Sequence, residues 1–240
     1  MRSRLLSFLN ARRHDARMRS FYGRLVSAGD LVFDIGANAG DRTGAFDRLG
    51  CRVVSVEPQQ KCVVALTRRF GARPNVTVVQ SAVGATEGTA EMFDSDSDVL
   101  SSLSTEWMAR VKESGRFADA TWGEPHIVPL TTLDHLIAAH GEPAFAKVDV
   151  EGYELEVLRG LSCPVRAVSF EFTPEAIQTA YECIDRLDAI GSYAFNVSYG
   201  ESMAFELEHD VPKERIRTVL AGVAGDHRLF GDIYARRTDA

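Results

Sequence analysis

The stretch Leu31-Val-Phe-Asp-Ile-Gly-Ala-Asn-Ala-Gly-Asp-Arg-Thr43 decides the fold of this chain. Leu31 to Ile35 is an apolar, β-prone run, short enough for a strand that is buried on both faces. The small residues from Gly36 to Gly40 let the backbone turn sharply and approach a ligand closely. Asp41 and Thr43 then fall in the first turn of a helix. Strand, glycine turn and helix in this order predict the nucleotide-binding unit of a doubly wound α/β fold.

A second buried strand is expected from Arg52 to Pro58, and its end carries the acid Glu57. A carboxylate in this position accepts hydrogen bonds from the two hydroxyls of a ribose. The alternative is a glycine turn that only joins a strand to a helix. Glu57 makes that alternative the weaker one.

The turn favours S-adenosylmethionine over a dinucleotide. In the G-x-G-x-x-G pattern of dinucleotide sites, the pyrophosphate lies on the helix N-terminus. Here Asn38 replaces the second glycine, the third glycine is missing, and Asp41 would repel a pyrophosphate. S-adenosylmethionine has no phosphate and carries an ammonium and a sulfonium. The residues that we expect to bind it are Asp34, Gly36, Ala37, Asn38, Gly40, Thr43, Glu57, Pro58, Ser81 and Ala82.

A second motif, Ala144-Phe-Ala-Lys-Val-Asp-Val-Glu-Gly-Tyr-Glu154, predicts a buried strand, a turn at Gly152 and a helix. Lys147, Asp149 and Glu151 alternate along the strand end, so we expect them on one face. Three ionisable groups at the end of an inner strand are costly unless ligands or partners meet them. The alternative is an internal Lys147–Asp149 ion pair that only orders the strand end.

Six segments resemble FkbM-type methyltransferases, and they occur in the family's order between about residues 30 and 236. The most specific is Lys147-Val-Asp-Val-Glu-Gly-Tyr-Glu154. The others are Asp34-Ile-Gly-Ala-Asn-Ala-Gly40, Val56-Glu-Pro58, Ser81-Ala-Val-Gly84, Thr132-Leu-Asp134 and Gly231-Asp-Ile-Tyr-Ala-Arg236. The resemblance implies S-adenosylmethionine-dependent O-methylation of a hydroxyl on a sugar, a polyketide or another secondary metabolite.

The expected architecture is a class I methyltransferase, Rossmann-like fold. Its doubly wound, seven-stranded sheet is mostly parallel, with one antiparallel strand near the C-terminus. Two paired strands are expected at residues 193–199 and 229–236. The region from about residue 94 to 125 is expected to be an irregular insertion that covers the site and contains Trp107, Phe117 and Trp122. We divide the chain into a basic helical segment, residues 1–29, and a methyltransferase domain, residues 30–240.

Methylation of a hydroxyl requires that it lose its proton, which calls for a base or a metal. The candidate bases are Asp149, Glu151 and Glu171, with His126 a weaker one, and Lys147 offsets the repulsion among the acids. Carboxylates on neighbouring strand ends also suit a hard divalent cation, so a metal remains open. An NAD(P)-dependent oxidoreductase and a non-catalytic Rossmann-like binding protein remain as alternative functions.

The composition is that of a globular enzyme, with 45% hydrophobic and 25% charged residues in 240. The four cysteines form no C-x-x-C pair, so reduced core cysteines and a cytoplasmic location are expected. No apolar run is long enough for a transmembrane helix. The expected partner is a small-molecule or glycan acceptor, not a nucleic acid, because the main body is acidic. A homo-oligomer is left open.

Charge is unevenly distributed along the chain. Residues 1–24 contain seven arginines and one acid, while the whole chain has a net charge of −7. Met18, Phe21, Tyr22 and Leu25 recur at helical spacing, which predicts a basic amphipathic helix. We expect this helix to pack against the acidic body or over the cofactor cleft. Binding to a membrane surface or to an anionic acceptor is the alternative.

Overall fold

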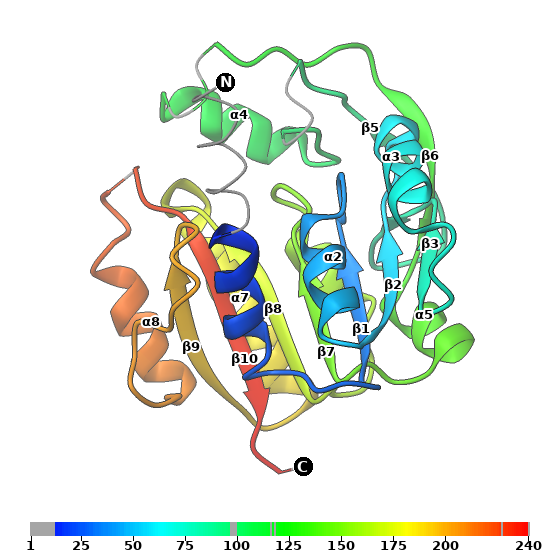
Figure 1. The fold of residues 1–240 in the computed structure, drawn as a ribbon. Helices are drawn as coiled ribbons and strands as arrows, with labels where there is room; N and C mark the ends of the chain where they lie inside the picture. Colours follow the sequence, from blue (N-terminus) through cyan, green and yellow to red (C-terminus); the bar gives the residue numbers. More distant parts are fainter. Residues whose placement is uncertain (1–12, 97–99, 116, 118, 227, 240) are drawn as a thin grey trace, which may run out of the picture.

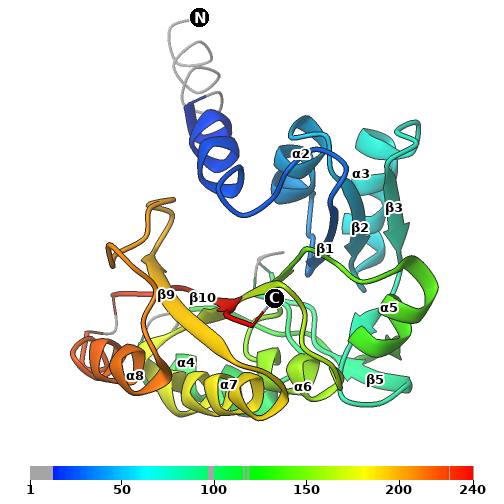
Figure 2. The same ribbon diagram turned by 90° about the horizontal axis from the view of Figure 1, so that it is seen from below.

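The computed structural model describes residues 13–96, 100–115, 117, 119–226 and 228–239. Two layers of helices enclose a central sheet, and a smaller sheet lies at one side (Figures 1 and 2). Helix α4 lies over the end of the central sheet to which the parallel strands point (Figure 1). The site is built at that end.

The central sheet has seven strands in the order β3-β2-β1-β7-β8-β10-β9. All neighbours are parallel except that β10 runs antiparallel to both β8 and β9. This confirms the predicted mostly parallel sheet with one antiparallel strand. The strands are β1 (Leu31–Ile35), β2 (Arg52–Val56), β3 (Val76–Val79), β7 (Phe145–Val148), β8 (Ala167–Phe172), β9 (Tyr193–Tyr199) and β10 (Gly231–Arg237).

The chain reverses its winding direction beside β1, which pairs with β2 on one side and with β7 on the other. In open α/β sheets a crevice forms outside the carboxyl ends of the strands at such a switch point. Asp34 lies beside Lys147 in the register of β1 and β7. The two motifs from the sequence therefore meet at one sheet edge, although Asp34 and Lys147 are 113 positions apart.

The alternation of side chains along β1 supplies both faces of the sheet with core residues. Phe33 and Ile35 belong to the core cluster under helices α5, α6, α7 and α8. Val32 belongs to a second cluster with Phe46 of α2. The helices are α2 (Asp41–Arg48), α3 (Gln60–Phe70), α5 (Leu133–His140), α6 (Glu154–Arg159), α7 (Ile177–Ile190) and α8 (Lys213–Ala221). A 3₁₀ turn, Pro174–Ala176, precedes α7.

Helix α4 (Thr105–Glu113) lies in the part of the chain that was expected to cover the site, and that part is flanked by strands of the smaller sheet. Its strands β4 (Ala82–Val83), β6 (His126–Thr131) and β5 (Gly88–Met92) pair in that order. Because residues 105–113 form a helix, the prediction of an irregular insertion is wrong for that stretch. The hydroxyl of Ser104 caps α4 by accepting from the Trp107 N–H, and Trp107, Met108 and Val111 bury its inner face.

Residues 13–22 are helical and pack against the sheet face opposite α7 (Figure 2). Met18, Phe21, Tyr22 and Leu25 are at most 8% exposed and lie in the core cluster with Phe46. The apolar stripe that the spacing predicted is thus buried against the domain itself. Residues 1–12 lie outside the described part of the chain.

Two further observations concern membrane-spanning helices and the cysteines. No helix among the described residues has the length and apolar character needed to span a bilayer. All four cysteines are free thiols, as expected. Cys163 is exposed, however, and not part of the core as predicted, because it lies in the turn between α6 and β8.

Candidate active site

A cavity of about 740 Å³ opens at the carboxyl ends of β1, β2, β7 and β8. The turn after β1 and the ends of β2 and β7 contribute to its wall. A cover, by which we mean residues 92–96, 100–115 and 117, also contributes to it. Eleven of the residues predicted for the site line it: Gly36, Ala37, Asn38, Gly40, Glu57, Pro58, Ser81, Ala82, Asp149, Glu151 and Glu171.

The glycine turn has the backbone conformation that its sequence demands. Gly36 and Gly40 have φ values of +79° and +85°, and Asn38 between them has φ +48°. A Cβ atom at Gly36 would lie 1.8 Å from the carbonyl oxygen of Asp149. From the sequence, a side chain at Gly36 is expected either to collide with the cofactor or to force an unfavourable φ, and the φ of +79° agrees with the second expectation. A side chain would also meet the backbone at the end of β7, so glycine is needed for folding as well.

Glu57 lies directly beside this turn and is 2% exposed. One carboxylate oxygen accepts from the Asn38 N–H and the other from the Gln59 N–H, both at 2.8 Å. Burial raises the pKa of Glu57 although both N–H groups act against that shift. The Gln59 side chain also donates a hydrogen bond to the carboxylate, which has about four lone-pair sites in all. Glu57 can therefore hold the turn and still accept hydrogen bonds from a ligand in the cavity.

Asp34 and Thr43 do not line the cavity. The Thr43 hydroxyl donates to an Asp34 carboxylate oxygen at 2.6 Å and lies 2.8 Å from the Ser55 hydroxyl. All three side chains are buried beneath the glycine turn. They link β1, α2 and β2, so their contacts position the turn, and the structure gives them no surface facing a ligand.

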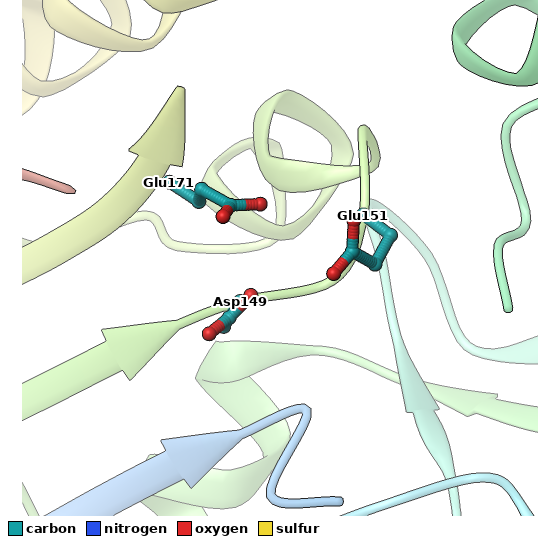
Figure 3. A group of neighbouring side chains, drawn as sticks. All are labelled: Asp149, Glu151 and Glu171. Carbon is teal, nitrogen blue, oxygen red and sulfur yellow. The ribbon is translucent and has the colours of Figure 1, made fainter. Parts of the chain in front are cut away.

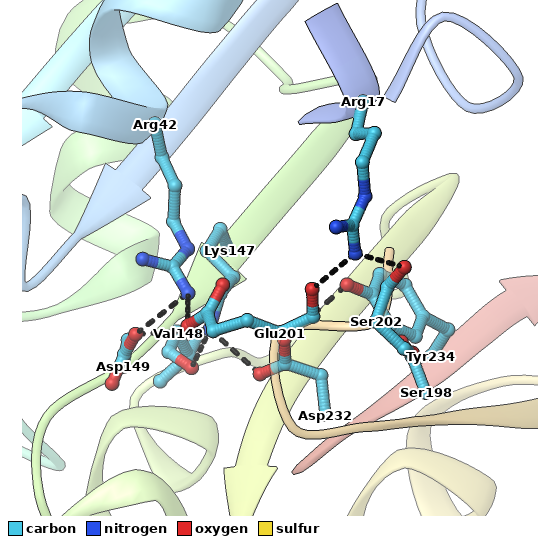
Figure 4. Close-up of polar contacts among 10 residues, drawn as sticks. All are labelled: Arg17, Arg42, Lys147, Val148, Asp149, Ser198, Glu201, Ser202, Asp232 and Tyr234. Atoms are coloured by element: carbon cyan, nitrogen blue, oxygen red, sulfur yellow. Dashed lines mark hydrogen bonds and ion pairs between the residues drawn. The ribbon is translucent and has the colours of Figure 1, made fainter. Parts of the chain in front are cut away.

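Lys147 also lies beneath the cavity, not in its wall. Its ammonium is fully buried, 2.8 Å from Asp232 of β10 and 3.2 Å from Asp149 (Figure 4). Arg42 of α2 approaches Asp149 from the cavity side at 3.9 Å and pairs with Glu201 at 3.0 Å. The Lys147–Asp149 ion pair that was the alternative interpretation is therefore present, and it extends into a larger network.

Asp149, Glu151 and Glu171 converge on one space (Figure 3). One carboxylate oxygen from each lies within 4.8 Å of the other two. Strand alternation does not explain this, because β7 ends at Val148 and Glu151 has a left-handed backbone, φ +52°. The Ser102 hydroxyl donates to the Glu151 carbonyl at 2.6 Å.

The three acids differ in their protonation. Burial acts to raise the pKa of Asp149, but Lys147 and Arg42 outweigh it and hold that pKa below the usual range. Burial, followed by repulsion from neighbouring carboxylates, raises the pKa of Glu151 and of Glu171 well above the usual range. The cluster thus contains one carboxylate that stays ionised and two that take up a proton readily.

The cover contacts both halves of the site. The Ser101 hydroxyl donates to the Gln59 side chain at 3.2 Å, next to Glu57. Trp107 packs on Gly152, where a Cβ atom would lie 2.2 Å from the indole. Because Ser102 holds the Glu151 carbonyl, the cover and the acid-bearing turn are joined at two points.

Sequence reasoning missed several residues of the cavity wall. Arg42, Gln59, Glu201 and Phe230 line it, and none stands in a local pattern that marks it. Arg42 lies at the start of α2, where the sequence pattern indicated only that the third glycine of a dinucleotide site is missing. His126, the weaker candidate base, does not line the cavity; it lies 3.8 Å from Asp94.

A family model described as the methyltransferase FkbM domain matches residues 34–200. No curated protein matches the chain. Among solved structures, a precorrin-6Y C5,15-methyltransferase from Geobacter metallireducens is 12% identical, with 93% of this chain and 86% of that chain covered and a TM-score of 0.49.

Two other structures show the same degree of similarity. An rRNA methylase from Streptococcus thermophilus is 9% identical, with coverage of 92% and 94% and a TM-score of 0.45. A TehB-like SAM-dependent methyltransferase from Corynebacterium glutamicum is 7% identical, with coverage of 92% and 88% and a TM-score of 0.45. At these scores the similarities carry no argument about substrates.

Proposed function

The chain belongs to the FkbM methyltransferase family, and from this premise we propose that it methylates a hydroxyl of a sugar, a polyketide or another secondary metabolite with S-adenosylmethionine. The observation that carries the proposal is the Glu57 carboxylate, which lies in the cavity wall beside the glycine turn. A carboxylate at the end of the second strand is where the ribose hydroxyls of a nucleoside are recognised.

The residues of the cavity fit this cofactor. Glu57 keeps acceptor capacity beside its bonds to Asn38 and Gln59, and the turn from Gly36 to Gly40 offers close backbone approach. Ser81 and Ala82 line the same wall, where they can edge an adenine. Asp41 at the start of α2 disfavours a pyrophosphate. The volume of about 740 Å³ lies in the upper part of the range for small-molecule sites, which leaves room for an acceptor.

S-adenosylmethionine, when bound, supplies an activated methyl group on a positively charged sulfur. The protein then has to align the acceptor and remove the hydroxyl proton. Asp149 stays ionised because of Lys147 and Arg42, so it is a weak base. Glu151 and Glu171 have raised pKa values, and a base works best when its pKa is near the working pH. We therefore assign the hydroxyl proton to a carboxylate oxygen of Glu151 or Glu171.

The cover supports an acceptor with an apolar face. Trp107, Phe117 and Leu103 line the cavity from the cover, and Phe230 lines it from the segment before β10. Flat rings with polar edges, such as sugars and cyclic polyketides, bury their apolar faces on such side chains. The acids in the floor then meet the hydroxyl groups.

A thermal-shift comparison separates the three candidate functions. S-adenosylhomocysteine should raise the melting temperature, because a ligand that binds only the folded state stabilises it. NADH and NADPH should leave it unchanged. A shift with either nicotinamide nucleotide but not with S-adenosylhomocysteine would favour the oxidoreductase. Binding of S-adenosylhomocysteine without turnover on any hydroxylated acceptor would favour a binding protein.

Glu57→Ala tests the cofactor assignment by calorimetry. Binding of S-adenosylhomocysteine should weaken by roughly 1.5–3 kcal/mol for each charged hydrogen bond that is lost. Glu91→Ala, on the exposed part of β5, is the matched control and should bind like the wild type. Because Glu57 also holds the turn, a melting curve must show that the variant is folded. Unchanged affinity in a folded Glu57→Ala protein would contradict the assignment.

Glu151→Gln, Glu171→Gln and Asp149→Asn test the catalytic assignment, since each keeps the volume and removes the charge. Turnover should fall by ~10²-fold or more in the variant that lacks the base, while affinity for S-adenosylhomocysteine changes little in Glu151→Gln and Glu171→Gln. Full activity in all three variants would show that the acids only brace the ends of β7 and β8.

A further inference from the structure

The acid cluster has a charge that the described protein does not balance. Asp149 is matched by Lys147 and Arg42. Within the described residues, neither the Glu151 nor the Glu171 carboxylate has a hydrogen-bond donor or a salt-bridge partner. Two carboxylates that face each other without a cation repel, and proteins keep such groups ionised only with a partner or a metal.

A neutral oxygen next to Glu171 is also without a partner. Thr173 is 7% exposed, and its hydroxyl makes no hydrogen bond to any residue that the structure describes. Thr173 follows Glu171 by two residues on extended backbone, φ −124° and ψ 147°. Its side chain therefore leaves the strand on the same face as Glu171, and both residues line the cavity. A buried hydroxyl left unpaired in this position points to a ligand that the protein chain does not supply.

The spacing of the oxygens matches a hard divalent cation. Ca²⁺ takes oxygen ligands at 2.3–2.6 Å and Mg²⁺ at 2.0–2.1 Å, so opposite ligands stand about 4–5 Å apart. The carboxylate oxygens of Asp149, Glu151 and Glu171 lie within 4.8 Å of one another. Three oxygens at this separation can therefore ligate one cation of either size.

We propose that Glu151, Glu171 and the Thr173 hydroxyl, with Asp149 at the margin, form a site for a hard divalent cation such as Mg²⁺ or Mn²⁺, which also binds the acceptor hydroxyl. This inference rests on the proposed function and gives the cluster its role. A cation bound to the hydroxyl oxygen lowers the pKa of that hydroxyl. The proton then passes to a carboxylate oxygen of the cluster that does not ligate the cation. Acceptors with two neighbouring oxygens should bind best, because both oxygens can ligate the cation.

The test is a titration of the full chain with MnCl₂, in which electron paramagnetic resonance measures the free Mn²⁺. We expect saturable binding of one Mn²⁺ per chain, with displacement by Mg²⁺. Glu171→Gln should weaken the affinity about tenfold or more, because the number of charged ligands sets the strength of such sites. Thr173→Val, which removes a neutral ligand, should weaken it less. Glu106→Gln, which removes an exposed carboxylate from α4, should bind like the wild type.

Two outcomes overturn the proposal. One is the absence of saturable binding up to about 1 mM Mn²⁺, the weak end for oxygen-ligand sites. The other is equal affinity in Glu171→Gln and the wild type. A melting curve in EDTA checks that Glu171→Gln is folded, and the removal of a like charge should not lower its melting temperature.

Calorimetry with S-adenosylhomocysteine in EDTA, on the same preparation, separates this proposal from the proposed function. Cofactor binding without Mn²⁺ binding refutes the cation site alone. Mn²⁺ binding without cofactor binding refutes the methyltransferase function and keeps the cation site.

Discussion

Gly36 lies where the turn after β1 passes the end of β7. Its φ of +79° is one that side-chain-bearing residues rarely adopt, and a Cβ atom there would lie 1.8 Å from the Asp149 carbonyl oxygen. The two requirements, conformation and space, are separable because Gly29 has a similar φ of +89° with nothing within 4 Å of its Cβ position.

Gly29→Ala should therefore cost about 1–2 kcal/mol of unfolding free energy, the price of a left-handed backbone alone. Gly36→Ala should cost roughly 3 kcal/mol or more, because the backbone at Asp149 must also move. Urea denaturation of the two variants measures the difference. Equal losses would show that the end of β7 yields freely, and that the turn and the acid cluster are not mechanically joined.

A functional residue could be predicted when its position after a strand marks it, and not when its role depends on contacts made in the tertiary fold. Glu57 and Asp149 directly follow the buried strands β2 and β7, so position alone marks them. The role of Thr43 was misjudged, because its hydroxyl turns inward to Asp34, and no local pattern shows which way a side chain in the first turn of a helix points. Glu201 and Phe230 enter the cavity from loops at the far end of the chain, and only the tertiary fold brings them there.

The six-residue helix α6 begins at Glu154, whose carboxylate accepts from the Val150 and Gly152 N–H groups. Burial raises the pKa of Glu154 from 4.5 to about 7, although these N–H groups favour the charged form. A group whose pKa is raised on folding adds stability below its unfolded pKa and loses that contribution as pH rises through its folded pKa. Glu154 should therefore destabilise the protein above neutral pH.

In EDTA, the contribution of Glu154 to the unfolding free energy should drop by about 2 kcal/mol between about pH 5.5 and about pH 8. Glu151 and Glu171 act in the same direction, Asp149 in the opposite one, and the Cys183 thiol on α7 stays protonated. The difference between wild type and Glu154→Gln isolates the Glu154 share. Parallel curves of stability against pH for the two proteins would refute it.

The elements that could be predicted are those whose burial is continuous. β1, β2, β7 and β8 are apolar runs bounded by glycine or charge, which is typical of strands covered on both faces. Helix α8 was not predicted, because only Ile216 and Leu220 of its nine residues are buried. The pairing of β4, β6 and β5 into a second sheet could not be predicted either, since the sequence of such short strands does not specify which residues pair with each other.

The N-terminal helical residues pack against the segment after β9, which forms one side of the cavity. Arg17 donates to the Glu201 and Ser202 carbonyls (Figure 4). Phe21 contacts the rings of Phe205, Tyr234 and Tyr22, with centroids 4.8–5.5 Å apart. The segment after β9, which brings Glu201 to the cavity, is thus supported from the opposite end of the chain. The support has a polar part at the surface and an apolar part in the core.

The apolar part should dominate. Phe21 is 2% exposed, and removing a buried phenylalanine side chain costs about 3–5 kcal/mol. The Arg17 bonds are exposed to solvent, where such contacts contribute about 1 kcal/mol or less. Phe21→Ala should therefore lower the unfolding free energy by several times more than Arg17→Gln, as urea denaturation will measure. Limited proteolysis should also cut residues 200–212 faster in Phe21→Ala. Equal losses in the two variants would mean that charge, and not packing, attaches the basic helix to the domain.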